Sequence, residues 1–261
     1  GGAAAAAAAA DDDDGGVGAG RVGRFMPVST SAFFADLAAS RVLDSNGNAV
    51  RFGDVWARQR VLIRLFRRLG CAYCRGEAKV LSKCHDELKA ANVRLVGCGT
   101  DYGAEEFVGL GFFSGDFYVS PDYDVHKHVQ GIKQVKGQGL GTFAQWGKVK
   151  KSKPRLVAHL GGEDEWAPGN KQGTDPYYGA VLLVGPGDRL HYSYAQQFPG
   201  DFPSNAEIMD AVRAAERRQP VTGGAAAAGA DAYSVFDSCV ETDRITAVYL
   251  FVAVVVTTLF V

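Results

Sequence analysis

A strand-length apolar run, a helix-like segment and a second apolar run follow one another closely, and this succession constrains the fold more than any other feature of the chain. Val61–Phe66 is the first apolar run and Val93–Cys98 is the second. Between them, Ala72–Ala91 carries apolar residues such as Leu81 and Leu88 at helical spacing. A strand, a helix and a strand in this order predict two parallel strands joined by a crossover helix.

The remaining patterns extend this unit into a sheet of mixed strand direction. We expect a helix through Phe33–Leu37 capped by Ser29 or Ser31, a hairpin around Asn46–Gly47 with arms at 41–43 and 49–51, a helix at Ala104–Leu110 capped by Asp101, a strand at Asp116–Val119, a helical turn at Val125–Val129, a hairpin from Ala180–Val184 and Arg189–Tyr194, and a helix from Ser204 or Asn205 to about Arg217. The order is βαβαβ, a variable connection, then ββα. It predicts a thioredoxin-like α/β fold, a mixed sheet flanked by helices.

Composition divides the chain into a folded part and two unusual ends. We expect residues 1–26 to be a disordered low-complexity segment, residues 27–219 to form one thioredoxin-like redox domain with a long loop or insertion at 131–176, residues 220–244 to form a linker, and residues 245–261 to form an apolar tail. The loop prediction rests on the Gly and Lys content of that segment, including the basic cluster Lys148–Arg155, which we interpret as a solvated surface.

Charge and cysteine content exclude some classes of function. The formal net charge of −1 leaves no excess of positive charge to hold a phosphate backbone, so nucleic acid is not expected as a partner. The five cysteines are too few and too unevenly spaced for a disulfide scaffold, and an odd count leaves at least one thiol unpaired. We therefore expect a cytoplasmic protein in which a few thiols carry out chemistry.

A Cys-x-x-Cys motif, Cys71 and Cys74, stands between the first predicted strand and the predicted helix. The N-terminus of a helix carries unsatisfied N–H groups and a partial positive charge, and both stabilise a thiolate. Arg67, Arg68 and Arg75 add cationic charge nearby, so we expect them to support the thiolate. Because Cys71 lies nearer the helix terminus, we expect it to be the more exposed nucleophile and Cys74 to be the resolving thiol.

Two other interpretations of these cysteines were weighed. Cys71, Cys74, Cys84 and His85 are possible zinc ligands, but Cys84 and His85 fall in the same predicted helix as Cys74, about 15 Å away for ten residues, too far to share one ion. The alternative is that the cysteines are inert and buried. For Cys98, at the end of a predicted strand, burial as a small hydrophobic residue is the better interpretation.

The segment from Phe66 to Arg75, with the sequence Phe-Arg-Arg-Leu-Gly-Cys-Ala-Tyr-Cys-Arg, resembles the motif of the AhpC/TSA-type peroxiredoxin-like family. Weaker matches follow in the family's order at Gly97–Gly99 with Phe107, at Asp116–Val119 and at Gly179–Gly187, so that the similarity spans about residues 33–215. The resemblance implies a thioredoxin-like fold and an antioxidant thiol redox role. Cys71 and Cys74 match the redox pair of the family directly.

The resemblance also implies how such a protein would work. It implies that no cofactor is bound, that electrons come from thioredoxin or an NADPH-linked thiol system, and that the substrate is a peroxide or a lipid endoperoxide. In the family's register, Cys71 occupies the place of a hydroxyl residue before Cys74, which would make Cys74 the thiol that attacks peroxide. A non-catalytic thioredoxin-fold redox sensor or binding module remains the alternative function.

The last 17 residues, Ile245–Val261, carry no charge and are rich in Val, Phe and Leu. As a helix they would span about 26 Å, at the short end for a bilayer core. We expect a membrane anchor with the redox domain on the cytosolic face; a GPI signal or a buried segment are the alternatives. Cys239, just before this tail, is a candidate for palmitoylation.

Overall fold

The computed structural model of the chain describes residues 31–100, 102–129, 132, 141–170, 176–187 and 189–218. The chain separates into two compact units, Gly1–Arg218 and Gln219–Val261, and all described residues belong to the first. The expected disordered segment 1–26, linker 220–244, Cys239 and apolar tail 245–261 lie outside the described residues. Within the described part of the chain, no helix is both long enough and apolar enough to cross a bilayer.

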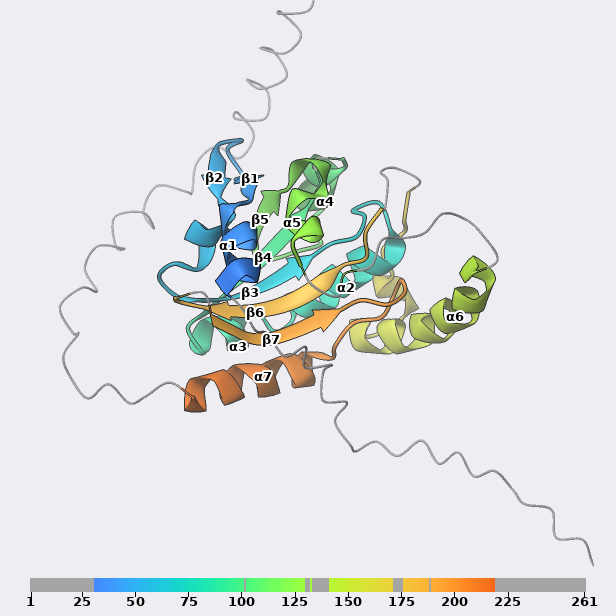
Figure 1. Cartoon of the computed structure of the whole chain (residues 1–261). Coiled ribbons are helices and arrows are strands. Elements are labelled where there is room, and N and C mark those ends of the chain that lie inside the picture. The colour runs from blue at the N-terminus through green and yellow to red at the C-terminus, as the bar shows by residue number, and fades with distance from the viewer. Residues whose placement is uncertain are drawn as a thin grey trace, which may run out of the picture. The chain divides into compact units, whose positions relative to one another are not determined.

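A mixed sheet forms the centre of the first unit (Figure 1). Its seven strands are β1 (Arg41–Leu43), β2 (Ala49–Arg51), β3 (Arg60–Leu65), β4 (Val93–Gly99), β5 (Asp116–Val119), β6 (Ala180–Gly185) and β7 (Arg189–Ala195), in the spatial order β2-β1-β5-β4-β3-β6-β7. The central strands β3, β4 and β5 are parallel, whereas β6 pairs with β3, and β7 with β6, in the antiparallel direction. The predicted thioredoxin-like mixed sheet is confirmed.

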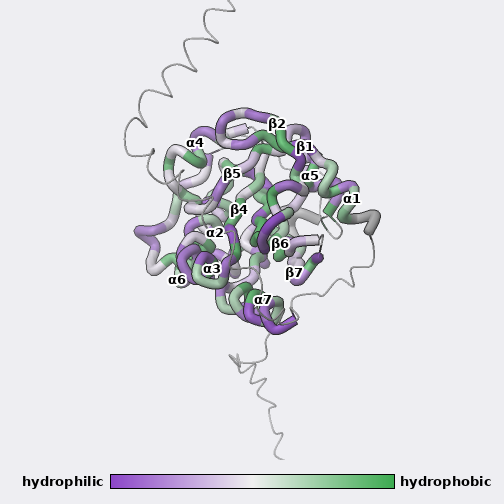
Figure 2. The backbone as a smooth tube through the Cα atoms, turned by 90° about the vertical axis from the view of Figure 1, so that its left-hand side faces the viewer, coloured by the Kyte–Doolittle hydropathy of each residue, from purple (hydrophilic) through white to green (hydrophobic). Residues whose placement is uncertain are grey.

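Helices cover both faces of the sheet. They are α1 (Ser31–Ala39), α2 (Ala72–Ser82), α3 (His85–Ala90), α4 (Ala104–Gly109), α5 (Asp124–Lys127), α6 (Gly141–Leu160) and α7 (Asn205–Arg217), with short 3₁₀ turns at Phe52–Trp56, Pro121–Tyr123 and Glu163–Glu165. Along β3, Leu62 packs into the core beneath α2 and α7, whereas Val61 and Ile63 pack into the core beneath α1 and α5. This alternation is what a strand buried on both faces requires. Figure 2 shows the hydrophobic segments running along the strands.

The predicted single helix at Ala72–Ala91 is wrong in one respect, because two helices, α2 and α3, occupy it. The N–H of Cys84 bonds to the carbonyl of Leu81 at 3.2 Å, three residues back rather than four, and the Cys84 thiol donates to the same carbonyl at 3.0 Å. These tight bonds end α2. The chain then restarts as α3 in a new direction, which brings Leu88 into the core.

The prediction of a long loop at 131–176 is also wrong for its central part, where α6 forms. Leu156 and Leu160, four residues apart, are buried against Val80 of α2 and Phe202. This apolar stripe stabilises the helix, while Lys148, Lys150, Lys151 and Arg155 remain exposed to solvent. The lysine and glycine content of the segment concealed this helix.

Two of the predicted helix N-termini have different outcomes. Ser204 caps α7 as expected: its hydroxyl accepts the N–H of Glu207 at 3.2 Å and the Glu207 carboxylate accepts the N–H of Ser204 at 2.7 Å. The expected capping of α4 by Asp101 is wrong, because Gly103 occupies the N-cap position with a φ of +80°. Glycine adopts this left-handed conformation without steric penalty, so no side-chain cap is needed to turn the chain.

Candidate active site

The two cysteines of the motif lie where β3 passes into α2. Cys71 is the N-cap residue of α2 and Cys74 lies in its first turn, as the sequence predicts. Cys71 and Cys74 are 4.0 Å apart, well beyond the roughly 2.05 Å of a disulfide bond. Both are free thiols. The site is therefore in its reduced, dithiol form.

Both cysteines are more deeply buried than the sequence suggested. Cys71 is 5% exposed and Cys74 is 1% exposed. The order is as expected, with Cys71 nearer the surface, but neither thiol projects into solvent. Residues far along the chain pack against the N-terminus of α2. One of them is Trp166, whose ring lies 5.4 Å from that of Tyr73.

The electrostatic surroundings separate the two thiols. The pKa of Cys71 lies well below its usual value, first because the Cys74 thiol donates a hydrogen bond to it, then because of the Arg67 charge, and also because the N–H groups of Cys74 and Tyr73 point at its sulfur; burial opposes this. The pKa of Cys74 lies well above its usual value, because it gives that hydrogen bond and is fully buried. These shifts favour the thiolate form at Cys71 and the protonated form at Cys74.

The three arginines predicted to support the thiolate have different positions. Arg67 is buried, and its Nη2 donates to the sulfur of Cys71 at 3.0 Å. Arg75 instead donates to the carbonyl of Leu69 at 3.0 Å and pairs with the Glu106 carboxylate at 2.8 Å. Within the described residues, neither Arg68 nor Arg75 donates a hydrogen bond to a sulfur. Only Arg67 therefore touches the thiolate.

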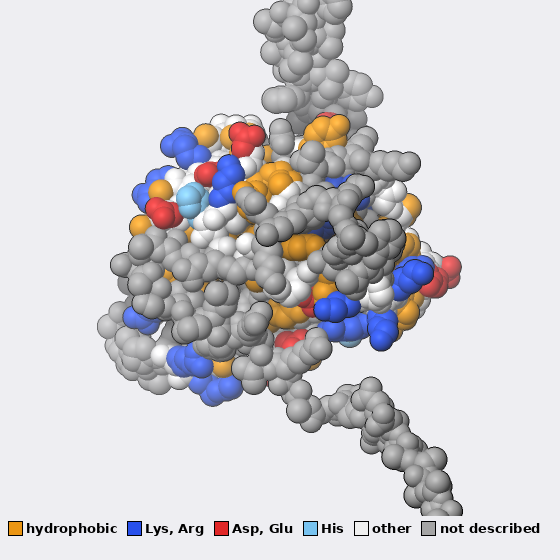
Figure 3. All heavy atoms as spheres, turned by 45° about the vertical axis from the view of Figure 1, so that its right-hand side comes forward, with side chains coloured by type: hydrophobic (Ala, Val, Ile, Leu, Met, Phe, Trp, Pro, Cys, Tyr) orange, Lys and Arg blue, Asp and Glu red, His pale blue; other side chains and the backbone are white. Residues whose placement is uncertain are grey.

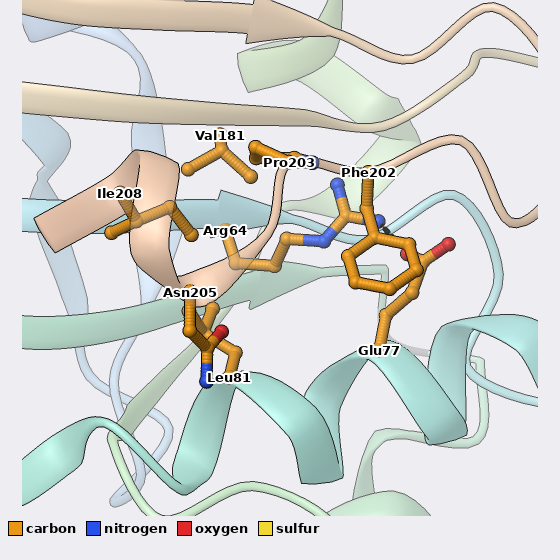
Figure 4. Close-up of a pocket in the computed structure, with 8 residues that line it drawn as sticks. All are labelled: Arg64, Glu77, Leu81, Val181, Phe202, Pro203, Asn205 and Ile208. Carbon is orange, nitrogen blue, oxygen red and sulfur yellow. Dashed lines mark hydrogen bonds and ion pairs between the residues drawn. The ribbon is translucent and has the colours of Figure 1, made fainter. Parts of the chain in front are cut away.

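A buried carboxylate behind Cys74 is a feature that the sequence analysis missed. Glu77, one turn after Cys74 in α2, forms an ion pair with Arg64 of β3 and accepts a hydrogen bond from Gln196 Nε2 at 2.9 Å. Burial raises its pKa to about 7, against the opposing charge of Arg64. Figure 4 shows Glu77 and Arg64 meeting at a small pocket that Asn205 and Phe202 also line. The sequence signal for its burial was its spacing: Glu77 lies three residues after Cys74 and four before Leu81, on the same face of α2 as these two buried residues.

The sequence analysis also found no role for His126. In the structure it is 1% exposed, with Nε2 3.1 Å from the carbonyl oxygen of Phe66 at the end of β3. Burial lowers its pKa to about 4. The neutral imidazole of His126 therefore bonds to the backbone at the end of β3, just before the turn that carries Cys71.

The zinc alternative is not supported by the positions of its ligands. No group of three or more His, Cys, Asp or Glu side chains within the described residues could hold a metal ion. Cys84 gives its thiol hydrogen to Leu81, and burial raises its pKa to about 11. Cys98, fully buried in the core beneath α1 and α5, has a raised pKa as well. Both are placed as small hydrophobic residues.

Comparisons with known proteins place this geometry in context. No family model matches the chain. The chain is 30% identical over 186 residues to prostamide/prostaglandin F synthase of Danio rerio, covering 70% of this chain and 89% of that protein. It is 28% identical over 179 residues to thioredoxin-like protein AAED1, chloroplastic, of Arabidopsis thaliana, covering 66% of this chain and 69% of that protein.

Among solved structures, peroxiredoxin Q of Xanthomonas campestris is similar at a TM-score of 0.47 and 12% identity, over 69% of this chain and 93% of that one. Peroxidoxin BcpB of Mycobacterium tuberculosis is similar at 0.45 and 14%, over 69% and 93%. The family assignment rests on the sequence relatives and on the Gly-Cys-x-x-Cys-Arg motif at 70–75. The chain belongs to the AhpC/TSA-type peroxiredoxin-like family, whose members share a thioredoxin-like fold and a thiol redox function.

Proposed function

We propose that this chain is a thiol-dependent peroxide reductase in which Cys71 attacks and Cys74 resolves. The observation that carries the proposal is the opposite shift of the two pKa values, lowered at Cys71 and raised at Cys74, with Arg67 donating to the Cys71 sulfur at 3.0 Å. A pair of this kind supplies one nucleophile and one proton donor at neutral pH. The same shifts favour Cys71 as the attacking thiol, whereas the family's register would make Cys74 the attacking thiol.

In the first step, the Cys71 thiolate attacks the terminal oxygen of a hydroperoxide. The sulfur–oxygen bond forms as the oxygen–oxygen bond breaks, which gives the Cys71 sulfenic acid and an alkoxide that takes up a proton to become the alcohol. Arg67, which is within hydrogen-bonding distance of the reacting sulfur, stabilises the anionic charge as it moves onto oxygen. Sulfur is oxidised and the peroxide is reduced.

In the second step, Cys74 attacks the sulfur of the sulfenic acid, which releases water and forms the Cys71–Cys74 disulfide. The 4.0 Å that separates the two residues is short enough for a side-chain adjustment to close the bond. A dithiol reductant of the thioredoxin type then exchanges with this disulfide and restores both thiols. The balance is one peroxide and one dithiol consumed, and one alcohol, one water and one disulfide produced.

The substrate is proposed as a peroxide or a lipid endoperoxide. Similarity to prostamide/prostaglandin F synthase, a relative at 30% identity, supports the lipid endoperoxide as the substrate. Both substrates contain the same weak oxygen–oxygen bond, but both oxygens of an endoperoxide are bonded to carbon. Attack by Cys71 would then give a sulfenate ester and one alkoxide, which is protonated, and Cys74 would displace the second alcohol in place of water, so that a diol and the Cys71–Cys74 disulfide are the products.

Thiol trapping with mass spectrometry tests this proposal. The reduced full chain receives one equivalent of hydrogen peroxide, and each cysteine is then identified as thiol, sulfenic acid or disulfide. We expect a Cys71–Cys74 disulfide in the unaltered chain, a Cys71 sulfenic acid in Cys74→Ser, and no rapid oxidation in Cys71→Ser. Cys84→Ser serves as the matched control and should oxidise like the unaltered chain.

Turnover is followed as peroxide-dependent NADPH oxidation in the presence of thioredoxin and its reductase. The proposal expects Cys71→Ser and Cys74→Ser to be inactive and Cys84→Ser to be active. Turnover in both motif variants would exclude the proposed pair. A sulfenic acid on Cys74 in Cys71→Ser would instead reverse the two roles. A disulfide that forms reversibly without turnover would identify a redox sensor.

A further inference from the structure

A short segment that follows α6 crosses the thiol loop. We call Ala167–Asn170 the strap and Gly70–Ala72 the thiol loop. The N–H of Asn170 donates to the carbonyl of Gly70 at 2.8 Å. The backbone of Gly169 lies so close to the loop that a Cβ atom there would be 2.8 Å from the nitrogen of Ala72 and 3.0 Å from the oxygen of Gly70. The strap therefore contacts the residues on both sides of Cys71.

One carboxylate links the side chain of Asn170 in the strap to the body of the protein. Glu106 of α4 accepts a hydrogen bond from Arg75 through Oε1 at 2.8 Å and one from Asn170 Nδ2 through Oε2 at 2.7 Å. Arg75 in turn donates to the carbonyl of Pro168 at 2.9 Å. Glu106 thus joins a buried arginine of α2 to the far end of the strap, although it touches neither sulfur.

We propose that the strap sets the size of the oxidant or disulfide that reaches Cys71, and that Glu106 is its latch and a specificity-determining residue. The identity of the substrate rests on the proposed function, but the limit on the size of molecules that reach the Cys71 sulfur is argued from the contacts of the strap alone. With the strap closed, Cys71 is 5% exposed although it is the N-cap residue of α2. A small peroxide reaches the sulfur past the closed strap. A bulky molecule needs the strap to lift.

The strength of the latch suits a segment that opens and closes. The Arg75 side chain is 4% exposed, but that of Glu106 is 38% exposed, so solvent screens the pair. Ala167 is the one buried side chain of the strap, and Pro168 and Gly169 face solvent. The strap therefore buries little apolar surface and is held mainly by hydrogen bonds, and such segments open at low cost. On the face drawn in Figure 3, hydrophobic and cationic side chains lie side by side.

The test measures how fast Cys71 is alkylated by a small and by a large reagent. The reduced full chain is treated with iodoacetamide or with a maleimide attached to a polyethylene glycol chain, and the adduct on Cys71 is quantified by peptide mapping. Glu106→Ala removes both hydrogen bonds of the latch and should raise the rate with the large reagent by about tenfold relative to the small one. Glu105→Ala, a neighbouring exposed carboxylate on α4, is the matched control and should leave the ratio unchanged.

A second variant approaches the strap from the other side. In Gly169→Ala the new Cβ collides with the backbone of the thiol loop and should push the strap away, which raises the same ratio while leaving Glu106 in place. The ratio removes any change in the intrinsic reactivity of the thiolate, because both reagents sense it equally. Unchanged ratios in both Glu106→Ala and Gly169→Ala, or an equal rise in Glu105→Ala, would overturn the inference.

The outcome is independent of whether the chain reduces peroxides. Alkylation requires no peroxide and no reductant, so the strap is tested even in a chain without turnover. Conversely, a chain that turns over hydrogen peroxide but shows unchanged alkylation ratios would keep the proposed function and lose the strap. In an active chain, Glu106→Ala should also raise kcat/KM for a lipid hydroperoxide more than for hydrogen peroxide.

Discussion

The guanidinium of Arg67 donates a hydrogen bond to the sulfur of Cys71 at 3.0 Å. Both side chains are buried, at 6% and 5% exposure. Water therefore solvates neither group well, and each charge is stabilised mainly by the other. The arginine precedes the cysteine by four residues, across the turn from β3 to α2. Arg67 makes this contact, whereas its neighbour Arg68 makes no hydrogen bond to either sulfur within the described residues.

Replacing Arg67 should therefore raise the pKa of Cys71. In Arg67→Met, we expect this pKa to rise towards its ordinary value, because a nearby opposite charge and its hydrogen bond are lost. The measurement is the pH dependence of thiolate absorbance, or of the iodoacetamide reaction rate at Cys71. Arg68→Met is the matched control, and an equal rise in that variant would contradict a specific role for Arg67.

The buried carboxylate of Glu77 should make folding stability depend on pH. Its pKa rises from 4.5 to about 7 on folding, so the folded state holds the proton more tightly. The stability due to protonated Glu77 is fully present below pH 4.5 and is lost as pH rises through 7. The free energy of unfolding relative to Glu77→Gln should fall by about 3 kcal/mol over that range. Urea titrations at several pH values measure it; the exposed Glu87→Gln should show no such trend.

His126 should act with the opposite sign. Its pKa falls from 6.5 to about 4 on folding, so the unfolded chain binds a proton that the folded chain rejects. The stability due to neutral His126 is present above pH 6.5 and is lost as pH falls through 4. Relative to His126→Gln, the free energy of unfolding should decrease by about 3 kcal/mol between pH 7 and pH 4. If His128→Gln, at the partly exposed C-cap residue of the same helix, gave the same difference, His126 would not be its source.

Phe66, which follows the central strand β3, should contribute much of the packing energy of the aromatic cluster next to the site. Its ring centroid lies 5.1 Å from that of Phe107 and 5.6 Å from that of Phe113, and it is fully buried. Phe66→Ala leaves a cavity among these rings and should cost about 3 to 5 kcal/mol of unfolding free energy. Tyr102→Ala, at a side chain that is 60% exposed, should cost about 0.5 kcal/mol or less. A loss of similar size in both variants would show that the aromatic cluster is not the cause.

The position of the site could be predicted from the sequence because it depends on local signals. A strand-length apolar run followed directly by a helical pattern places Cys71 at a helix N-terminus whatever surrounds it. The N–H groups of Tyr73 and Cys74 do point at the sulfur of Cys71, as that argument requires. The same kind of signal located the N-terminus of α7 and both hairpins.

The helix α6 and the buried pair of Arg64 and Glu77 could not be predicted in this way. Leu156 and Leu160 give too narrow an apolar stripe to stand out among lysines, and only the surface of α2 shows why it suffices. Charged side chains such as Glu77 are rarely buried, so the sequence favours the surface for them. Burial became tolerable only because Arg64 from β3 and Gln196 after β7 meet Glu77 in space.

The sequence by itself determined that two thiols stand at the start of the first core helix, because strand and helix periodicity and the unpaired N–H groups of a helix terminus are properties of adjacent residues. Only the tertiary structure decided which arginine reaches Cys71, which thiol keeps its proton, and that the strap Ala167–Asn170 lies over both neighbours of Cys71. These depend on burial and on distances between residues up to about a hundred positions apart, such as Gly70 and Asn170, which hydrogen bond at 2.8 Å. Electrostatic energies change steeply with such distances and with the exclusion of water, and neither quantity is written in a local pattern.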